Sequence, residues 1–248
     1  MAEGRIVAIL QARMSSSRLP GKVLAPILGR PMLARQIDRV RRSRSIDRLV
    51  VATSDRADDA PIAALCEREG VECFRGSLDD VLDRFYRCAV HHRANHVVRL
   101  TGDCPLADPD LIDALVDMYL GANVDYASNC RPPTLPDGLD AEVFGMQALE
   151  QAWREASDPF EREHVVPFII RRPERFRVAN WTWTEDLSAM RWTVDRPEDL
   201  EFVRRVFESL CPASPEFGFR DVLALIRAVP ELGRINQGIQ RNEGSISK

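Results

Sequence analysis

Basic and hydroxyl residues crowd into one short stretch of the chain, residues 11–22, which reads QARMSSSRLPGK. Three serines lie between Arg13 and Arg18, and the stretch ends on Pro-Gly-Lys. It follows an apolar run, residues 6–10, that predicts a short buried strand. A strand followed by a loop of small residues with a basic end is suited to hold phosphates through backbone N–H groups. The alternative is a polar surface loop without a ligand.

Lys22 at the end of this loop is one of two lysines among the 34 basic residues, and the other is the C-terminal Lys248. A lysine ammonium is a compact charge that reaches a phosphate oxygen where a planar guanidinium does not fit, which favours a functional role for Lys22. The loop is not a Walker A motif, because no glycine lies five residues before Gly21 and Val23 stands where Ser or Thr would contact magnesium. The sequence also contains no G-x-G-x-x-G motif for a dinucleotide.

Two aspartates follow predicted strands and could bind a metal ion. Asp103 comes just after the strand predicted at residues 95–100, and Asp195 follows one predicted at 191–194. Carboxylates at the end of strands are good ligands for a hard cation such as Mg²⁺. Helix capping is the competing role. Asp108, followed by Pro109, is expected to cap the helix after Asp103, whereas Asp195 itself could cap the helix predicted at residues 198–210.

These residues must be positioned by an α/β fold, because strands and helices alternate through the first half of the chain. The pattern predicts a Rossmann-like, mostly parallel sheet with helices on both faces. Ligands bind such sheets at the carboxyl ends of the strands. Besides the strands named above, strands are predicted at residues 49–53, 71–74 and 124–128, and helices at residues 31–44, 57–69, 79–92 and 110–120.

The alternation loosens after residue 130. A small lid or dimerisation subdomain is expected at about residues 130–185, within a single domain at 1–237 that is followed by a flexible tail at 238–248. Trp181 and Trp183 are expected to pack between sheet and lid or at a subunit interface. In this half, strands are predicted at residues 139–144 and 176–184, and helices at 146–155, 161–170 and 219–229, with the sheet resuming near Trp192.

Composition excludes several classes of protein. The net charge of −4 argues against bulk nucleic-acid binding, yet residues 1–50 hold eleven Arg or Lys against three Asp or Glu, which suits a small polyanion. No apolar run approaches the roughly 18 residues that span a membrane, and the N-terminus does not resemble a signal peptide. The six cysteines form no C-x-x-C pair, so we expect reduced thiols and a cytoplasmic protein.

Several motifs, in this order, resemble those of the cytidylyltransferase family that activates acidic sugars. The chain is similar to its spore coat polysaccharide biosynthesis branch and to enzymes that make CMP-activated octulosonate and sialic acids. The residues that carry the resemblance are ARMSSSRLPGK at 12–22, FRGS at 74–77, DVLDR at 80–84, TGDCP at 101–105, GLDAEVF at 138–144, REH at 162–164 and TVD at 193–195.

The resemblance implies a role for each matching position. Nucleotide binding falls to Gln11, Ala12, Arg13, Ser15, Ser16, Ser17, Arg18, Gly21, Lys22, Arg75, Gly76, Asp80, Thr101, Gly102 and Asp103, and among them Arg13, Lys22 and Asp103 would be catalytic. Magnesium would be held by Asp103 and Asp195. The second substrate would contact Asp140, Glu142, Arg162, Glu163 and His164.

The activity implied is the Mg²⁺-dependent transfer of CMP from CTP to an acidic sugar or phosphorylated acceptor, with release of pyrophosphate, by a homodimer. A nucleotide-sugar glycosyltransferase is the rival enzyme class. Such enzymes often use D-x-D for their metal, but the match here, Asp108-Pro109-Asp110, lies at a predicted helix start. A catalytically silent binding protein of the same fold is the other alternative.

Overall fold

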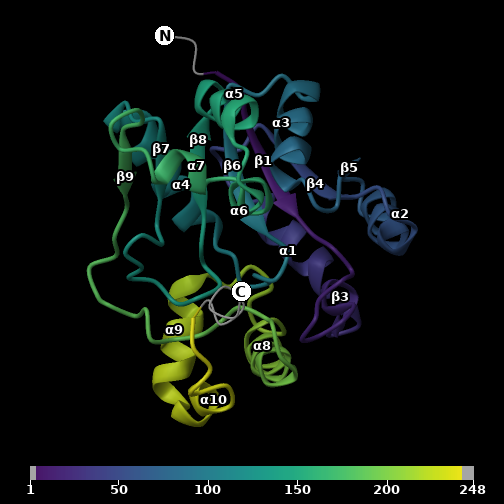
Figure 1. Ribbon diagram of the computed structural model, residues 1–248. Coiled ribbons are helices and arrows are strands. Elements are labelled where there is room, and N and C mark those ends of the chain that lie inside the picture. Colours follow the sequence, from purple (N-terminus) through teal and green to yellow (C-terminus); the bar gives the residue numbers. More distant parts are fainter. Residues whose placement is uncertain (1–3, 242–248) are drawn as a thin grey trace.

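A central sheet of seven strands organises the computed structural model, which describes residues 4–241 (Figure 1). The strand order is β5-β4-β1-β6-β8-β7-β9, and a separate two-stranded sheet pairs β2 with β3. Strand β8 is antiparallel to both of its neighbours, whereas the other pairings within the central sheet are parallel. The predicted fold class, a mostly parallel Rossmann-like sheet, is therefore confirmed. The strands are β1 (Ile6–Gln11), β2 (Pro26–Ile27), β3 (Arg30–Pro31), β4 (Arg48–Ser54), β5 (Glu72–Gly76), β6 (His96–Thr101), β7 (Tyr126–Ser128), β8 (Glu142–Gly145) and β9 (Val178–Asn180).

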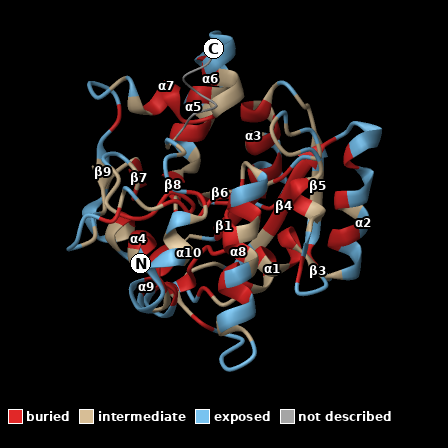
Figure 2. Cartoon of the chain, turned by 90° about the horizontal axis from the view of Figure 1, so that it is seen from below, coloured by how far each residue is buried: buried red, intermediate tan, exposed pale blue. Residues whose placement is uncertain are grey.

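Helices cover both faces of the sheet, which is why residues 6–10 of its middle strand β1 are apolar without interruption (Figure 2). In β1, Ala8 and Leu10 point to one face and Val7 and Ile9 to the other, and all four are fully buried. The first face packs against α1, α2, α4, α8 and α9, and the second against α3, α5 and α7. The α-helices are α1 (Met32–Val40), α2 (Ala60–Arg68), α3 (Val81–His91), α4 (Pro109–Ala122), α5 (Met146–Glu155), α6 (Pro159–His164), α7 (Pro167–Ile170), α8 (Pro197–Leu210), α9 (Phe219–Ala228) and α10 (Pro230–Arg234), with 3₁₀ turns η1 (Lys22–Leu24) and η2 (Ala57–Asp59).

The first helix is shorter than the predicted 31–44, because a buried carboxylate binds the turn that follows it. Asp113 on α4 accepts hydrogen bonds from Ser43 Oγ at 2.5 Å and from the backbone N–H groups of Arg44 and Ser45 at 3.1 Å. Those N–H groups are thereby satisfied without a helical carbonyl partner. The helix ends at Val40.

The helix predicted at residues 161–170 is two helices, α6 and α7. Between them Val165 adopts a left-handed φ of 73°. Pro167 then begins α7, and proline both lacks an N–H donor and disfavours a helical conformation in the residue before it. The prediction of one continuous helix was therefore wrong.

Two predicted strands also differ from the structure. The strand expected at 176–184 is reduced to β9, because Trp181 N donates to Ser128 O at 2.7 Å and Trp183 N to Thr134 Oγ1 at 2.8 Å as the chain leaves the sheet. Residues 191–194 form no strand, and the sheet does not resume there. Instead, the N–H groups of residues 192 and 193 donate to Asp137 O, at 2.6 and 2.8 Å.

Segments from the second half of the chain complete the sheet and help to cover both of its faces. Strands β8 and β9, both from residues 130–185, belong to the central sheet. Trp181 and Trp183 pack against the core, and the Trp183 ring lies 5.3 Å from that of Phe219 on α9, as expected for packing residues. Helices α8, α9 and α10 gather at the lower end of Figure 1. Of the tail predicted at 238–248, residues 242–248 lie outside the described part of the chain. No helix within residues 4–241 is long and apolar enough to cross a membrane.

Candidate active site

The two acidic segments predicted to bind a metal lie side by side. Val194 N donates to Asp103 O at 2.8 Å, and Thr193 Oγ1 donates to the same carbonyl at 3.2 Å. Gly102 makes the approach of β6 to β1 possible, because a Cβ there would lie 3.0 Å from the Gln11 carbonyl oxygen. Asp103 and Asp195, 92 positions apart in the chain, thus reach the same place at the carboxyl end of the sheet.

Lys22 lies between these two carboxylates. Its Nζ donates to Asp195 Oδ1 at 2.8 Å, to Asp103 Oδ2 at 3.2 Å and to the Val194 carbonyl at 2.7 Å. An ammonium group has three N–H donors, so all three have partners. The residue is 8% exposed, and the structure therefore holds the internal lysine as a nearly buried cation at the predicted metal position.

The charges of this cluster stabilise one another. Burial lowers the pKa of Lys22, but the nearby carboxylates of Asp103 and Asp195 outweigh burial and raise that pKa above its ordinary value. Burial raises the pKa of both aspartates, and the Lys22 ammonium more than offsets it, so each pKa lies below its ordinary value. Both carboxylates are therefore ionised at neutral pH.

Asp195 is surrounded by basic side chains and is not the residue that caps α8. Its Oδ2 accepts from Arg18 at 2.8 Å and from Arg191 at 3.1 Å. The capping carboxylate is that of Asp199, which accepts the backbone N–H groups of Asp195 at 2.9 Å and Arg196 at 3.0 Å. The Asp195 side chain is thus left to bind cations, as the metal hypothesis requires.

The loop that precedes Lys22 is held by its own backbone and by a buried acid. Gly21 has a left-handed φ of 72°, and its N–H donates to Met14 O at 3.0 Å. Met14 N in turn donates at 2.7 Å to Asp59, which also binds Ser54. Sequence reasoning missed Asp59, although an acidic residue shortly after the end of β4 was a signal that could have found it. Arg13, Ser15 and Ser17 are exposed on the loop.

Three of the predicted nucleotide-binding residues make structural contacts near the ends of β4 and β5. Arg75 donates to the carbonyls of Ser54 at 3.0 Å and Arg56 at 2.7 Å. Gly76 O accepts from Asp55 N at 2.8 Å. Asp80 caps α3, since its Oδ1 accepts from Asp83 N at 2.9 Å. Gln11 Oε1 is a buried acceptor with no partner among the described residues, which a ligand at the end of β1 would satisfy.

The residues predicted to contact the second substrate fall into two places. Asp140 forms an ion pair with Arg241, and Glu142 is buried, binding Arg99 and accepting from Tyr126 Oη at 2.6 Å. Burial raises the pKa of Glu142, but Arg99 outweighs it and the pKa lies below its ordinary value. The other three, Arg162, Glu163 and His164, lie on α6.

Arg162 on α6 is bound by structural partners. Its Nη2 lies 2.7 Å from Asp80 Oδ2, and its Nη1 donates to the carbonyls of Trp153 at 2.9 Å and Ala156 at 3.1 Å. These bonds tie α6 to α3 and α5. The His164 ring packs 4.4 Å from that of Phe160. A role in acceptor binding stays a prediction for these residues.

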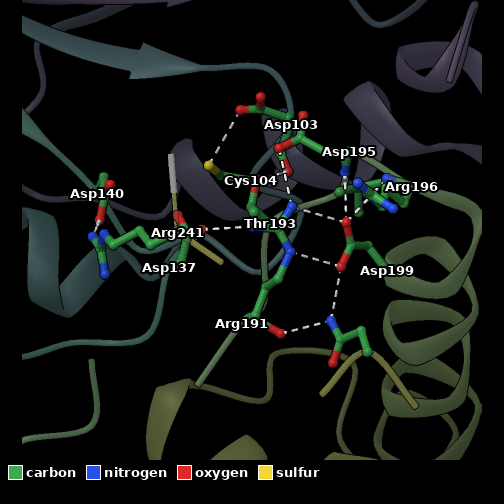
Figure 3. Close-up of polar contacts among 12 residues, drawn as sticks. Asp103, Cys104, Asp137, Asp140, Arg191, Thr193, Asp195, Arg196, Asp199 and Arg241 are labelled. Atoms are coloured by element: carbon green, nitrogen blue, oxygen red, sulfur yellow. Dashed lines mark hydrogen bonds and ion pairs between the residues drawn. The ribbon is translucent and has the colours of Figure 1, made fainter. Parts of the chain in front are cut away.

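A buried network behind the site was not predicted from the sequence (Figure 3). Arg191 donates to Asp199 Oδ1 at 2.9 Å and to Asp137 Oδ2 at 2.8 Å, in addition to Asp195. Asn236 donates to Arg191 O at 3.0 Å and to Asp199 Oδ1 at 2.9 Å. Burial, reinforced by repulsion from Asp140, raises the pKa of Asp137 to about 6. This network fixes the orientation of Asp195 from behind.

The donor set fits a hard divalent cation, although no group of three or more His, Cys, Asp or Glu within residues 4–241 forms a ready-made metal site. Asp103 and Asp195 offer two ionised carboxylates that already converge on one cation, the Lys22 ammonium. Mg²⁺ is commonly bound through one or two carboxylates, with substrate phosphates and water as its other ligands. The two aspartates are sufficient protein ligands for such an ion.

Comparison with known proteins agrees with this geometry. The family model described as cytidylyltransferase matches residues 7–217. A solved cytidylyltransferase from Leptospira borgpetersenii serovar Hardjo-bovis superposes with a TM-score of 0.90 and 32% identity, covering 96% of this chain and 100% of that one. The spore coat polysaccharide biosynthesis protein SpsF of Bacillus subtilis is 31% identical over 239 residues, 91% of this chain and 95% of the relative.

A third relative matches only part of the chain. The 3-deoxy-manno-octulosonate cytidylyltransferase of Anaeromyxobacter sp. is 38% identical over 131 residues, 52% of each protein. The family model and the two relatives that match over nine-tenths of the chain are sufficient to assign it. The protein belongs to the cytidylyltransferase family and is a nucleotidyltransferase.

Proposed function

We propose that this nucleotidyltransferase is a Mg²⁺-dependent enzyme that couples CTP to an acidic sugar, giving a CMP-activated product and pyrophosphate for surface polysaccharide or glycoconjugate biosynthesis. The observation that carries the proposal is Lys22 held between Asp103 and Asp195 at the end of the basic loop. The choice of CTP rests on the family, and that of an acidic sugar on the octulosonate-specific relative.

The basic loop would bind the triphosphate. Arg13 is exposed at its start and Arg18 and Lys22 lie at its inner end, so an incoming triphosphate meets cations along its length. Lys22 would exchange part of its contact with the two aspartates for phosphate oxygens. Its charge would then stabilise the negative charge that grows on the pyrophosphate leaving group.

The transfer itself requires positioning more than covalent chemistry by the protein. A hydroxyl oxygen of the acceptor attacks the α-phosphorus in line, forming one P–O bond while the bond from that phosphorus to the bridging oxygen of the β-phosphate breaks. Pyrophosphate leaves, and the hydroxyl proton passes to solvent. Asp103 and Asp195 would hold Mg²⁺, which when bound neutralises phosphate charge. The network of Arg191, Asp199 and Asn236 keeps Asp195 in place throughout.

The acceptor would lie against the segment that follows residue 130. Asp140, close to the ends of β6 and β8, is suited to accept hydrogen bonds from sugar hydroxyls. Glu142 would support it from within the sheet, and Arg162, Glu163 and His164 would approach from α6, on the lid that we propose for residues 130–185. We further propose a homodimer in the cytoplasm, where the six free cysteines of the chain stay reduced.

A pyrophosphate-release screen tests the proposal directly. The four nucleoside triphosphates are each combined with Mg²⁺ and a panel of acidic sugars and phosphosugars. We expect the wild-type protein to release pyrophosphate with CTP and a sugar acid. Lys22→Ala should release none, which would show that the activity belongs to this site. Release that is independent of any acceptor, or transfer of sugar from a nucleotide sugar, would contradict the proposal.

A further inference from the structure

Arg241 reaches the acceptor side of the site from outside the part of the chain that the family model matches, which ends at residue 217. Its guanidinium forms an ion pair with Asp140 Oδ1 (Figure 3). It also donates to the Leu135 carbonyl at 3.1 Å. Both partners precede β8, so Arg241 lies at the start of the segment expected to bind the acceptor. The guanidinium has five N–H donors, and these contacts use Nη1 and Nη2, so donors remain for a ligand.

The segment that carries Arg241 is anchored in the protein. After α10, Asn236 is 4% exposed and binds the backbone of Arg191 and the carboxylate of Asp199. Arg241 follows five residues later with a side chain that is 16% exposed. The guanidinium is therefore presented from a fixed base, with part of its surface open.

The surroundings of Arg241 are acidic. Asp140 is repelled by Glu142 and Asp103 and raises the pKa of neighbouring Asp137. Arg191, also labelled in Figure 3, is already shared among the carboxylates of Asp137, Asp195 and Asp199. An anionic acceptor that approached Asp140 would be repelled by several carboxylates. A cation beside Asp140 is therefore needed to bind the negative charge of the acceptor.

We propose that Arg241 selects the acceptor: its guanidinium binds the carboxylate of a sugar acid while the adjacent Asp140 accepts a hydrogen bond from a hydroxyl of the same molecule. A guanidinium and a carboxylate side by side are complementary to a hydroxy acid, which carries one acceptor group and one donor group. A planar fork of N–H groups also matches a carboxylate in two parallel hydrogen bonds. The inference rests on the proposed function, because it assigns a residue to its acceptor.

The test measures binding without turnover. Calorimetry follows the binding of 3-deoxy-manno-octulosonate, N-acetylneuraminate and the methyl ester of each, in the presence of Mg²⁺ and an α,β-methylene analogue of CTP. Wild type is expected to bind at least one acid about 10- to 100-fold more tightly than its ester. Arg241→Ala should lose this preference and leave the affinity for the CTP analogue within about 2-fold. Arg241→Lys should restore part of the preference, since it keeps the charge but not the fork.

A double variant tests whether Arg241 binds the carboxylate of the acceptor or only neutralises the charge of Asp140. If Arg241 only offsets the charge of Asp140, then Arg241→Ala combined with Asp140→Asn should recover the preference for the acid, and that recovery would overturn the proposal. Equal binding of acid by wild type and Arg241→Ala, including binding by neither, overturns it as well. The matched control is Arg205→Ala, which removes an exposed arginine of α8 that pairs with Glu201 and should change nothing.

Failure of the proposed function gives a different result. Acid binding that depends on Arg241, with no pyrophosphate release from CTP, leaves the inference standing and removes the transfer reaction. Pyrophosphate release that is equally fast in wild type and Arg241→Ala, with an unchanged KM for the acceptor, leaves the transfer reaction standing and overturns the role of Arg241. Melting temperatures of all variants are compared with that of the control to confirm that each is folded.

Discussion

The Lys22 ammonium and the Asp195 carboxylate form an ion pair 2.8 Å long across 173 positions of sequence. The pair joins the loop after the first strand to the segment before α8, and Asp103 completes it from β6. The Lys22 ammonium offsets the repulsion between the Asp103 and Asp195 carboxylates before any substrate binds. A divalent cation bound together with a triphosphate would lie between the same two carboxylates.

Replacement of Lys22 should remove activity even when the charge is kept. Lys22→Ala leaves Asp103 and Asp195 facing each other without a cation, and kcat/KM is expected to fall by a factor on the order of 10² to 10³. Lys22→Arg should fall by at least about 10-fold, because a planar guanidinium cannot reproduce the three donor directions of the ammonium at this nearly buried position. Steady-state pyrophosphate release measures both. Turnover of Lys22→Arg close to that of wild type would show that geometry at this position is unimportant.

Asp103→Asn and Asp195→Asn should each abolish magnesium-dependent turnover. The amide preserves the shape of the side chain but removes the charge that makes it a strong ligand for a hard cation. Because both aspartates would serve one ion, the double variant should be little worse than either single variant. Activity is followed across a magnesium titration.

A matched control for these variants is Asp221→Asn. Asp221, at the third position of α9, accepts from Gly218 N at 2.7 Å. Asn keeps an acceptor oxygen there and the residue lies outside the site, so activity should be unchanged. Wild-type activity of Asp195→Asn with an unchanged magnesium optimum would remove Asp195 from the metal site and leave Asp103.

Asp137 should make stability depend on pH in mildly acidic solution. Burial raises its folded-state pKa from 3.8 to about 6, so the folded protein binds the proton more tightly than the unfolded chain does. The stability that Asp137 contributes is present below about pH 4 and is lost as the pH rises through 6. Asp137→Asn does not titrate, and its free energy of unfolding relative to wild type should increase between pH 4 and 7, by up to about 3 kcal/mol. Urea unfolding at several pH values tests this, and a difference that stays constant with pH contradicts it.

We expect the protein to be a dimer at micromolar concentration, with a mass about twice the 28.1 kDa of the chain in light scattering. Strand β9 is at one edge of the central sheet, and its Val178 is 44% exposed. An edge strand with an exposed apolar residue is a ready surface for pairing. Val178→Asp should weaken association, whereas Val90→Asp, at an exposed position on α3, should not. A monomer at this concentration would rule out the dimer.

Local patterns predicted the first half of the fold well. The uninterrupted apolar run of β1 predicts a strand buried on both faces, and Asp108 before Pro109 predicts the start of α4, where Asp108 does accept from Asp110 N and Leu111 N. The sequence Asp108-Pro109-Asp110, which matches the D-x-D metal motif of glycosyltransferases, therefore begins a helix here. The strand predicted at 176–184 failed because alternation alone cannot tell a strand from a segment whose tryptophans pack on a distant helix.

The site was predictable where its residues lie in short motifs. Asp103 lies in TGDCP and Asp195 in TVD, and Lys22 stands out in a chain otherwise rich in arginine. Arg191 and Asn236 carry no such mark, since Arg191 contacts Asp137 across 54 positions and Asn236 contacts Asp199 across 37. Only the tertiary fold brings them together, so no local pattern could have selected them from other arginines and asparagines.

The pair of Arg99 and Glu142 sets the register between β6 and β8. The two residues are direct partners in the register of β6 and β8, and sliding β8 by one residue would turn Glu142 to the opposite face and leave both charges unpaired. Asp103 follows Arg99 by four residues and Asp140 precedes Glu142 by two. A charged pair inside the sheet therefore sets the separation between Asp103, which we propose as a metal ligand, and Asp140, which we propose as an acceptor contact, before any substrate binds.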